Sequence, residues 1–470
     1  MKTPKKHLNI FLLSMINISA ICSIRNWPVA AEYGFSSLFL IVLAALIFFI
    51  PVALVSAELA TGWPEEGGIF VWVKEAFGHK MGFLSIWYLW MTNIPWYPTL
   101  LSFIATTIAF VIAPSWVNHP YYIFGTTLIL FWSATALNLC GMKISGWLST
   151  IAVLVGTILP GIVMIALASH YWMSGAPLQI TVSWSAFFPK VHSVQDLVFL
   201  TGILFSFAGI EMSSVHANDV ENPQRSYPRA IFLSASMILL ISALGALSIA
   251  MVIPQEKIHF TSGALDSLSY FFEAYHISFL LPLFAACIAI GSFGQMSTWI
   301  AGPSKGLLAA AKQEDLPAVL LKTNAKGMPV GLLVAQGLVV SFLALVFVFM
   351  PSINSSFWLL TALTAQYYLL LYILMFAAAI YLRYKKNDVP RSYRVPGGKT
   401  GLTLISALGM LSSTIFFLVG FIPPSQIETG SVFFYEMFLV LGMIIGSLIP
   451  SLLMFFKKSS MKTAANANVL

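Results

Sequence analysis

Residues 17–28 of this chain read Asn17-Ile-Ser-Ala-Ile-Cys-Ser-Ile-Arg-Asn-Trp-Pro28. They lie inside an apolar segment, residues 9–31, which is long enough to cross a bilayer because a spanning helix needs about 20 apolar residues. Small and polar residues, an arginine and a proline at its centre indicate that this helix is interrupted. A second such stretch, Phe205-Ser-Phe-Ala-Gly-Ile-Glu-Met-Ser-Ser214, lies in the apolar segment 196–217. Interrupted membrane helices expose backbone groups to a cavity, an arrangement typical of transporters.

The composition excludes a water-soluble protein. Of 470 residues, 59% are hydrophobic and 9% are charged, against about 25% charged residues in soluble domains. The net charge of +7 does not indicate a nucleic-acid partner, because the charges lie at the ends of apolar segments. The chain has no phosphate-binding loop, His-Glu-x-x-His motif or paired Cys-x-x-Cys motif. We therefore expect neither an enzyme nor a protein that needs a cofactor or a metal.

The pattern of apolar segments predicts an all-α membrane protein of about twelve transmembrane helices. Polar stretches of up to about 25 residues connect them, too short for a separate soluble domain. The expected helices are residues 9–31, 36–60, 82–113, 120–141, 145–170, 196–217, 228–253, 276–311, 329–350, 356–383, 401–422 and 431–456.

The distribution of Lys and Arg predicts the orientation, because cytoplasmic loops carry the excess of these residues. With the N-terminus in the cytoplasm, 21 of the 24 fall inside, and only Lys190 and Lys257 fall outside. We expect a cytoplasmic tail at residues 1–8, one transporter domain at residues 9–456 and a second cytoplasmic tail at residues 457–470.

The two interruptions occupy equivalent places in the chain. Each lies in the first helix of a five-helix set, and the sets cover residues 9–170 and 196–383. Helices at residues 401–456 follow them. This spacing is the one expected of two inverted repeats with a terminal pair of helices appended.

Two ionisable residues lie deep in the interrupted helices, where charge is costly and often functional. Glu211 is either a paired structural carboxylate or a proton-sensitive or gating group beside the substrate. Arg25 either extends to the outer interface near Glu32 or contacts an anionic group, on a substrate or on Glu211. Polar residues of the later helices, Gln295 and Gln366 among them, are further candidates for setting specificity.

Several stretches together resemble one family. They are Phe49-Ile-Pro-Val-Ala-Leu-Val-Ser-Ala-Glu-Leu-Ala-Thr61 with Gly62-Trp-Pro-Glu-Glu-Gly-Gly-Ile-Phe-Val-Trp-Val73, Gly209-Ile-Glu211 with Glu221-Asn-Pro223, Ser248-Ile-Ala-Met-Val-Ile-Pro254, Trp299-Ile-Ala-Gly-Pro-Ser-Lys-Gly306 and Pro396-Gly-Gly-Lys399. The chain resembles amino acid permeases of the amino acid–polyamine–organocation superfamily. Within that group it is most similar to bacterial glutamate/γ-aminobutyrate antiporters.

The resemblance implies a LeuT-type fold of five plus five helices with two extra C-terminal helices. It also implies that the α-carboxylate and α-amino groups of a substrate meet the unwound parts of two helices. The substrate-binding positions that it implies are Ser19, Cys22, Ser23, Phe205, Ala208, Gly209, Glu211, Trp299 and Tyr368. The chain departs from the family in three ways: it lacks a Gly-x-Gly in the first helix, has Gln295 in place of a glutamate, and ends in a short tail.

The expected function is secondary-active amino acid transport by alternating access, with antiport of the glutamate/γ-aminobutyrate type as the nearest family activity. Proton-coupled symport of neutral or other amino acids is the alternative, and a non-transporting sensor is a remote one. The expected partners are an amino acid, the lipid bilayer and, in some mechanisms, protons. The protein would be a monomer or homodimer in the bacterial inner membrane.

Overall fold

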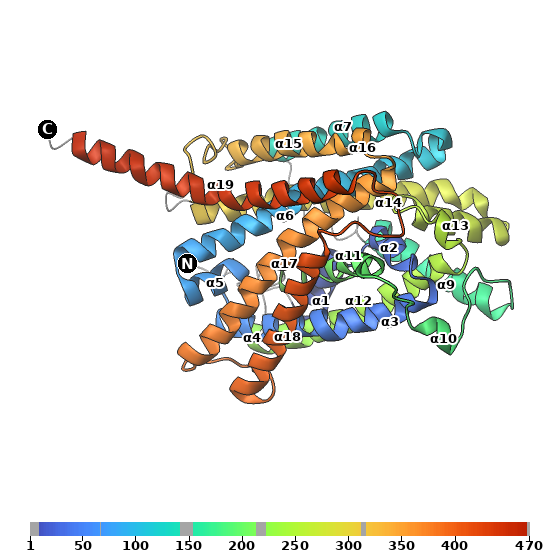
Figure 1. Ribbon diagram of the computed structural model, residues 1–470, viewed down its shortest axis with the longest axis horizontal. Coiled ribbons are helices and arrows are strands. Elements are labelled where there is room, and N and C mark those ends of the chain that lie inside the picture. The colour runs from blue at the N-terminus through green and yellow to red at the C-terminus, as the bar shows by residue number, and fades with distance from the viewer. Residues whose placement is uncertain (1–8, 66, 142–153, 213–221, 312–315, 468–470) are drawn as a thin grey trace.

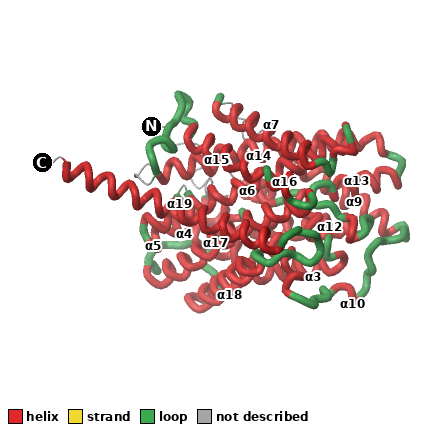
Figure 2. The backbone as a smooth tube through the Cα atoms, turned by 45° about the horizontal axis from the view of Figure 1, so that its top comes forward, coloured by secondary structure: helices red, strands yellow, loops and turns green. Residues whose placement is uncertain are grey.

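The structure is a computed structural model that describes residues 9–65, 67–141, 154–212, 222–311 and 316–467. All regular elements in this part of the chain are helices (Figure 2). Eleven of the described helices are long and apolar enough to cross a membrane. The predicted all-α membrane class is therefore confirmed.

The first predicted span is absent from these eleven because it is broken. It consists of α1 (Ile10–Ile21), a 3₁₀ turn (Ile24–Asn26) and α2 (Trp27–Ala31). Cys22 and Ser23 between them have extended backbone angles. Pro28 lies in the first turn of α2, where its missing N–H leaves no intrahelical hydrogen bond unmade. The predicted break in this helix is confirmed.

The sixth span is interrupted as well. After a 3₁₀ turn (Val194–Leu197), α11 (Val198–Ser206) ends and the chain turns through Phe207. Gly209 has a φ of 112°, a backbone conformation that residues with a Cβ rarely adopt. A 3₁₀ turn follows at residues 210–212, and residues 213–217 of the predicted span lie outside the described residues.

The remaining membrane helices follow the predicted ranges to within one or two turns, except where residues 142–153 lie outside the described part. They are α3 (Ser37–Ala44) with α4 (Ile50–Gly62), α6 (His79–Ile112), α7 (Pro120–Leu139), α9 (Leu159–Met173), α12 (Pro223–Ala250), α14 (Leu281–Ala311), α15 (Val330–Ala344) with α16 (Val346–Phe349), α17 (Ile353–Lys385), α18 (Gly398–Val419) and α19 (Val432–Ala467). The last helix is longer than expected, because most of the predicted tail 457–470 continues α19.

Three connections expected to be only polar stretches contain short helices. These are α5 (Ile69–Phe77), α10 (Trp184–Phe187) and α13 (Gly263–Ala274). The strongly amphipathic α5 packs its apolar face on α6 and α17. Figure 1 shows many of the spans, α6, α7, α15 and α19 among them, running along the long axis of the molecule, with α17 and α18 inclined to them and with the N and C labels at the same end. We call this the terminal end. The long helices α6 and α17 lie in the middle of the bundle and are its most buried spans.

Glycines on two neighbouring helices receive the indole ring of Trp27, which is 3% exposed. A Cβ on Gly245 of α12 would lie 2.4 Å from this ring, and one on Gly161 of α9 would lie 2.7 Å from it. Real Cβ atoms do not approach heavy atoms so closely. These two glycines therefore allow α2 to pack tightly between α9 and α12.

The Gly245→Ala variant is expected to be less stable than the wild-type protein by about 1–3 kcal/mol, because overpacking forces a buried ring out of place. Gly125→Ala in α7 is a matched control, since a Cβ there meets nothing within 4 Å. Thermal unfolding in detergent measures the effect. Equal melting temperatures for Gly245→Ala and the wild type would contradict this packing.

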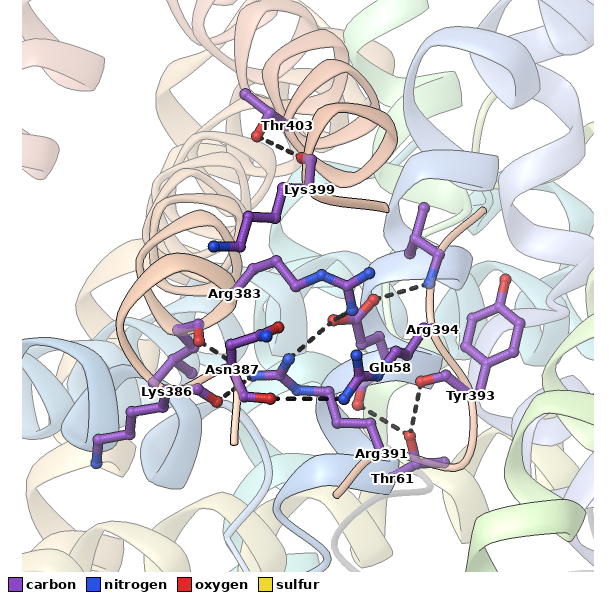
Figure 3. A network of polar contacts seen from close by, with 12 residues as sticks. Glu58, Thr61, Arg383, Lys386, Asn387, Arg391, Tyr393, Arg394, Lys399 and Thr403 are labelled. Carbon is purple, nitrogen blue, oxygen red and sulfur yellow. Dashed lines mark hydrogen bonds and ion pairs between the residues drawn. The ribbon is translucent and has the colours of Figure 1, made fainter. Parts of the chain in front are cut away.

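A buried ionic cluster joins α4, α17 and the loop before α18 at the terminal end (Figure 3). The carboxylate of Glu58 accepts a hydrogen bond from Nη1 of Arg383 at 2.8 Å and from the backbone N–H of Val395 at 2.8 Å. Nη1 of Arg391 lies 3.6 Å from the same carboxylate. All three charged side chains are at most 7% exposed. One carboxylate thus holds two arginines and the loop.

Arg391 is itself enclosed. Its Nη2 donates to the carbonyls of Leu382 and Lys386, both at 3.0 Å, and its guanidinium lies 4.9 Å from the ring centre of Trp63. Burial lowers the pKa of Arg391, whereas Glu58 acts in the opposite direction. The cluster therefore fixes the end of α17 to the end of α4.

Candidate functional site

A small internal cavity of about 50 Å³ lies where the two interrupted helices meet α6, α14 and α17. An amino acid is larger than this space, so side chains in its wall must move when one enters. The residues that line the cavity come from five membrane spans. They are Ile21, Ser23, Arg25, Asn26, Thr92, Asn93, Trp96, Phe205, Ser206, Ala208, Gln295, Trp299 and Tyr368.

Aromatic rings form two sides of the cavity. The ring centroids of Trp96 and Trp299 are 6.0 Å apart, and those of Phe205 and Tyr368 are 6.1 Å apart. The backbone carbonyl of Trp299 accepts a hydrogen bond from the Tyr97 hydroxyl at 2.9 Å. These rings are the parts of the wall that can rotate without breaking a helix, so they are suited to cover and release a substrate.

Glu211 lies next to the cavity and is 2% exposed. Its carboxylate accepts hydrogen bonds from the hydroxyls of Tyr368 at 3.1 Å and Tyr372 at 2.7 Å. The Tyr372 hydroxyl also accepts the backbone N–H of Gly209 at 2.8 Å. Two tyrosines of α17 therefore hold the turn of the sixth span, and one of them, Tyr368, is also part of the cavity wall.

Arg25 points into the bundle. Its side chain is 2% exposed and lines the cavity, and Nη1 donates to the Thr99 hydroxyl at 2.6 Å. The guanidinium lies between two rings, 5.7 Å from the centre of Trp96 and 5.6 Å from that of Phe357. Of the two interpretations of Arg25 that the sequence left open, extension to the interface near Glu32 is wrong, because the side chain is buried beside these rings.

The cavity gathers seven of the residues selected from the sequence: Ser23, Arg25, Phe205, Ala208, Gln295, Trp299 and Tyr368. Three others adjoin it: Gly209 and Glu211 through the tyrosines, and Cys22 as the buried residue that ends α1. The side chain of Ser19 lies outside the described residues. Gln366 does not reach the cavity, because it packs beside Gly420 at the end of α18.

The predicted substrate-binding positions did not include five other residues of the cavity wall: Asn26, Ser206 and the α6 residues Thr92, Asn93 and Trp96. The sequence does contain a pattern that links the α6 residues. Trp96 lies three residues after Asn93 and four after Thr92, and residues at these spacings are neighbours on a helix surface. Thr92 and Asn93 donate to the backbone carbonyls of Tyr88 and Leu89 in their own helix. Their other polar atoms remain available to a ligand.

Within the described part of the chain, no three His, Cys, Asp or Glu side chains form a group that could hold a metal ion. The polar groups that face the cavity are instead an arginine, amides, hydroxyls and interrupted backbone. Such groups can bind the carboxylate and ammonium of a zwitterion without a metal.

A family model described as amino acid permease matches residues 8–445. The chain belongs to the amino acid permease family. This permease is 45% identical over 458 residues to an uncharacterized transporter of Legionella pneumophila, covering 97% of the chain and 98% of the relative. It is 32% identical over 452 residues to two glutamate/γ-aminobutyrate antiporters of Lactococcus lactis, covering 95% of the chain and 90% of each antiporter.

The permease also has the fold of a solved transporter. A manganese transporter of Eremococcus coleocola superposes with a TM-score of 0.53 over 98% of this chain and 97% of the other. At 13% identity this likeness concerns the fold alone. It agrees with the LeuT-type architecture that the family resemblance implied.

Proposed function

We propose that the permease exchanges amino acids across the bacterial inner membrane by alternating access, with glutamate and γ-aminobutyrate as the exchanged pair. The observation that carries this proposal is the cavity at the two helix breaks, closed by aromatic rings and bordered by buried Arg25 and Glu211. The 32% identity to two glutamate/γ-aminobutyrate antiporters over almost the whole chain supports the choice of substrates.

In this proposal the breaks bind the α-carboxylate and α-amino groups of an α-amino acid such as glutamate. Ser23 begins the 3₁₀ turn of the first span, and the first N–H groups of a helical segment have no intrahelical acceptor. These N–H groups would donate to the α-carboxylate, and Ser19 and Cys22 would complete that side. Ala208 and Gly209 of the sixth span would receive the α-amino group through their backbone.

Alternating access would follow from movement between the two five-helix repeats, residues 9–170 and 196–383, beside the terminal pair at residues 401–456. The contacts that must change include the ring contact between Trp96 of the first repeat and Trp299 of the second. Phe205 and Trp299 would cover the substrate in turn. We place both termini in the cytoplasm, since 21 of the 24 Lys and Arg residues then fall on the cytoplasmic side, where membrane proteins carry the excess of these residues.

A second candidate function is proton-coupled symport of a neutral amino acid. Buried Glu211 favours it, because a carboxylate at membrane depth can carry a proton. Gln295 favours it as well, because this cavity residue is uncharged. In symport a proton gradient would drive accumulation in vesicles that contain no amino acid.

Uptake of labelled glutamate into proteoliposomes separates the two functions. For exchange we expect at least about tenfold faster uptake into vesicles loaded with γ-aminobutyrate than into empty ones, with little effect of an imposed pH gradient. Gradient-driven accumulation in empty vesicles would contradict exchange and support symport.

A further inference from the structure

Arg25 is a buried cation that has no anionic partner among the residues described. Its guanidinium has one hydrogen bond, to the Thr99 hydroxyl, while Nε has no partner. No carboxylate lies within 4 Å of it among the residues that the structure describes. The nearby acid of the cavity, Glu211, accepts hydrogen bonds from two tyrosines instead.

An unpaired buried charge is costly, so its presence requires a reason. The rings of Trp96 and Phe357 offset part of the desolvation by cation–π attraction. Nε of Arg25 has no partner, and the edge of a guanidinium matches a carboxylate with two parallel hydrogen bonds. Because Arg25 also lines the cavity, the missing anion can arrive as part of a substrate.

We propose that Arg25 binds the carboxylate at the far end of the substrate and thereby selects amino acids that carry one there. The inference rests on the proposed function and names the chemical feature that the site recognises. The guanidinium extends to Thr99 and Trp96 of α6 and to Phe357 of α17. The α-carboxylate and α-amino groups would bind at the helix breaks, at Ser23 and Ala208, so the far carboxylate is the group left for Arg25.

Three substrates of related structure test which carboxylate Arg25 binds. Glutamate has both carboxylates, glutamine has only the α-carboxylate, and γ-aminobutyrate has only the one that corresponds to the far carboxylate of glutamate. We expect Arg25→Gln to reduce glutamate and γ-aminobutyrate uptake at least about thirtyfold, since unpairing buried charged groups has effects of this order. Glutamine uptake should change less than about threefold. Arg229→Gln is the matched control, because Arg229 is exposed on α12.

A second variant, Arg25→Met, separates a substrate role from a structural one. Replacing a buried charge by an apolar side chain of similar length is often neutral or stabilising. We therefore expect Arg25→Met to melt at the wild-type temperature or above it, yet to lose uptake of glutamate and γ-aminobutyrate. A lower melting temperature together with an equal loss for all three substrates would show a structural role and overturn the inference.

Two further outcomes would overturn the inference while leaving amino acid transport intact. One is an unchanged glutamate-to-glutamine ratio in both Arg25 variants. The other is a wild-type protein that carries glutamine but neither glutamate nor γ-aminobutyrate. A wild-type protein that carries none of the three would contradict the proposed function itself.

Discussion

The Glu58→Ala variant is expected to lose about 3–5 kcal/mol of folding stability, the range typical of removing one partner of a buried ion pair. Without this carboxylate, Arg383 and Arg391 remain buried together as two like charges, and the N–H of Val395 loses its acceptor. The loop before α18 would then detach from α4. Thermal unfolding of the purified protein in detergent measures the loss.

An exposed ion pair at the same end of the molecule is the control. Lys386 and Glu75 lie closer together, with Nζ and Oε2 2.6 Å apart, but their side chains are 40% and 34% exposed. Exposed pairs contribute about 0–1 kcal/mol because water already solvates both charges. Glu75→Ala should therefore shift the melting temperature much less than Glu58→Ala does. Equal shifts would contradict the claim that burial makes the Glu58 cluster important.

The Glu211→Ala variant is expected to lose at least about a hundredfold in exchange rate, equivalent to about 2.7 kcal/mol. Removing the carboxylate leaves the hydroxyls of Tyr368 and Tyr372 without this acceptor, and an unsatisfied buried polar group costs about 1–3 kcal/mol. The turn at Gly209 would no longer be held in the position that shapes the cavity. The initial rate of labelled glutamate exchange in proteoliposomes measures this effect.

Tyr372→Phe is the graded comparison for Glu211→Ala. It keeps the ring but removes the hydroxyl that donates to Glu211 and accepts from Gly209. We expect a loss of about tenfold, smaller than that of Glu211→Ala, because Tyr368 still bonds the carboxylate. If Glu211→Ala exchanged as fast as the wild type, the carboxylate would be only structural.

The helix breaks were predictable because their chemistry is local. Extended backbone at Cys22 and Ser23 and a positive φ at Gly209 occur where the sequence places small and polar residues among apolar ones. The direction in which the side chain of Arg25 points was not predictable from the sequence. Its environment is set by Trp96 and Phe357, which lie on helices distant in sequence, so both the interface and the cavity were consistent with the sequence.

Gln366 shows a second limit of prediction from the sequence. Residues of α17 are buried on every face of the helix. Its sequence therefore has no amphipathic pattern that would indicate which side faces the cavity. Tyr368 faces the cavity, whereas Gln366 packs beside Gly420. The buried cluster at Glu58 was equally hidden, because its partners come from two segments more than 300 residues away.

The most direct test of exchange at the described cavity is the efflux of labelled γ-aminobutyrate from preloaded proteoliposomes. We predict that external glutamate accelerates this efflux at least about tenfold, and that the acceleration is absent in Glu211→Ala. Efflux that proceeds at the same rate with and without external glutamate would contradict the account.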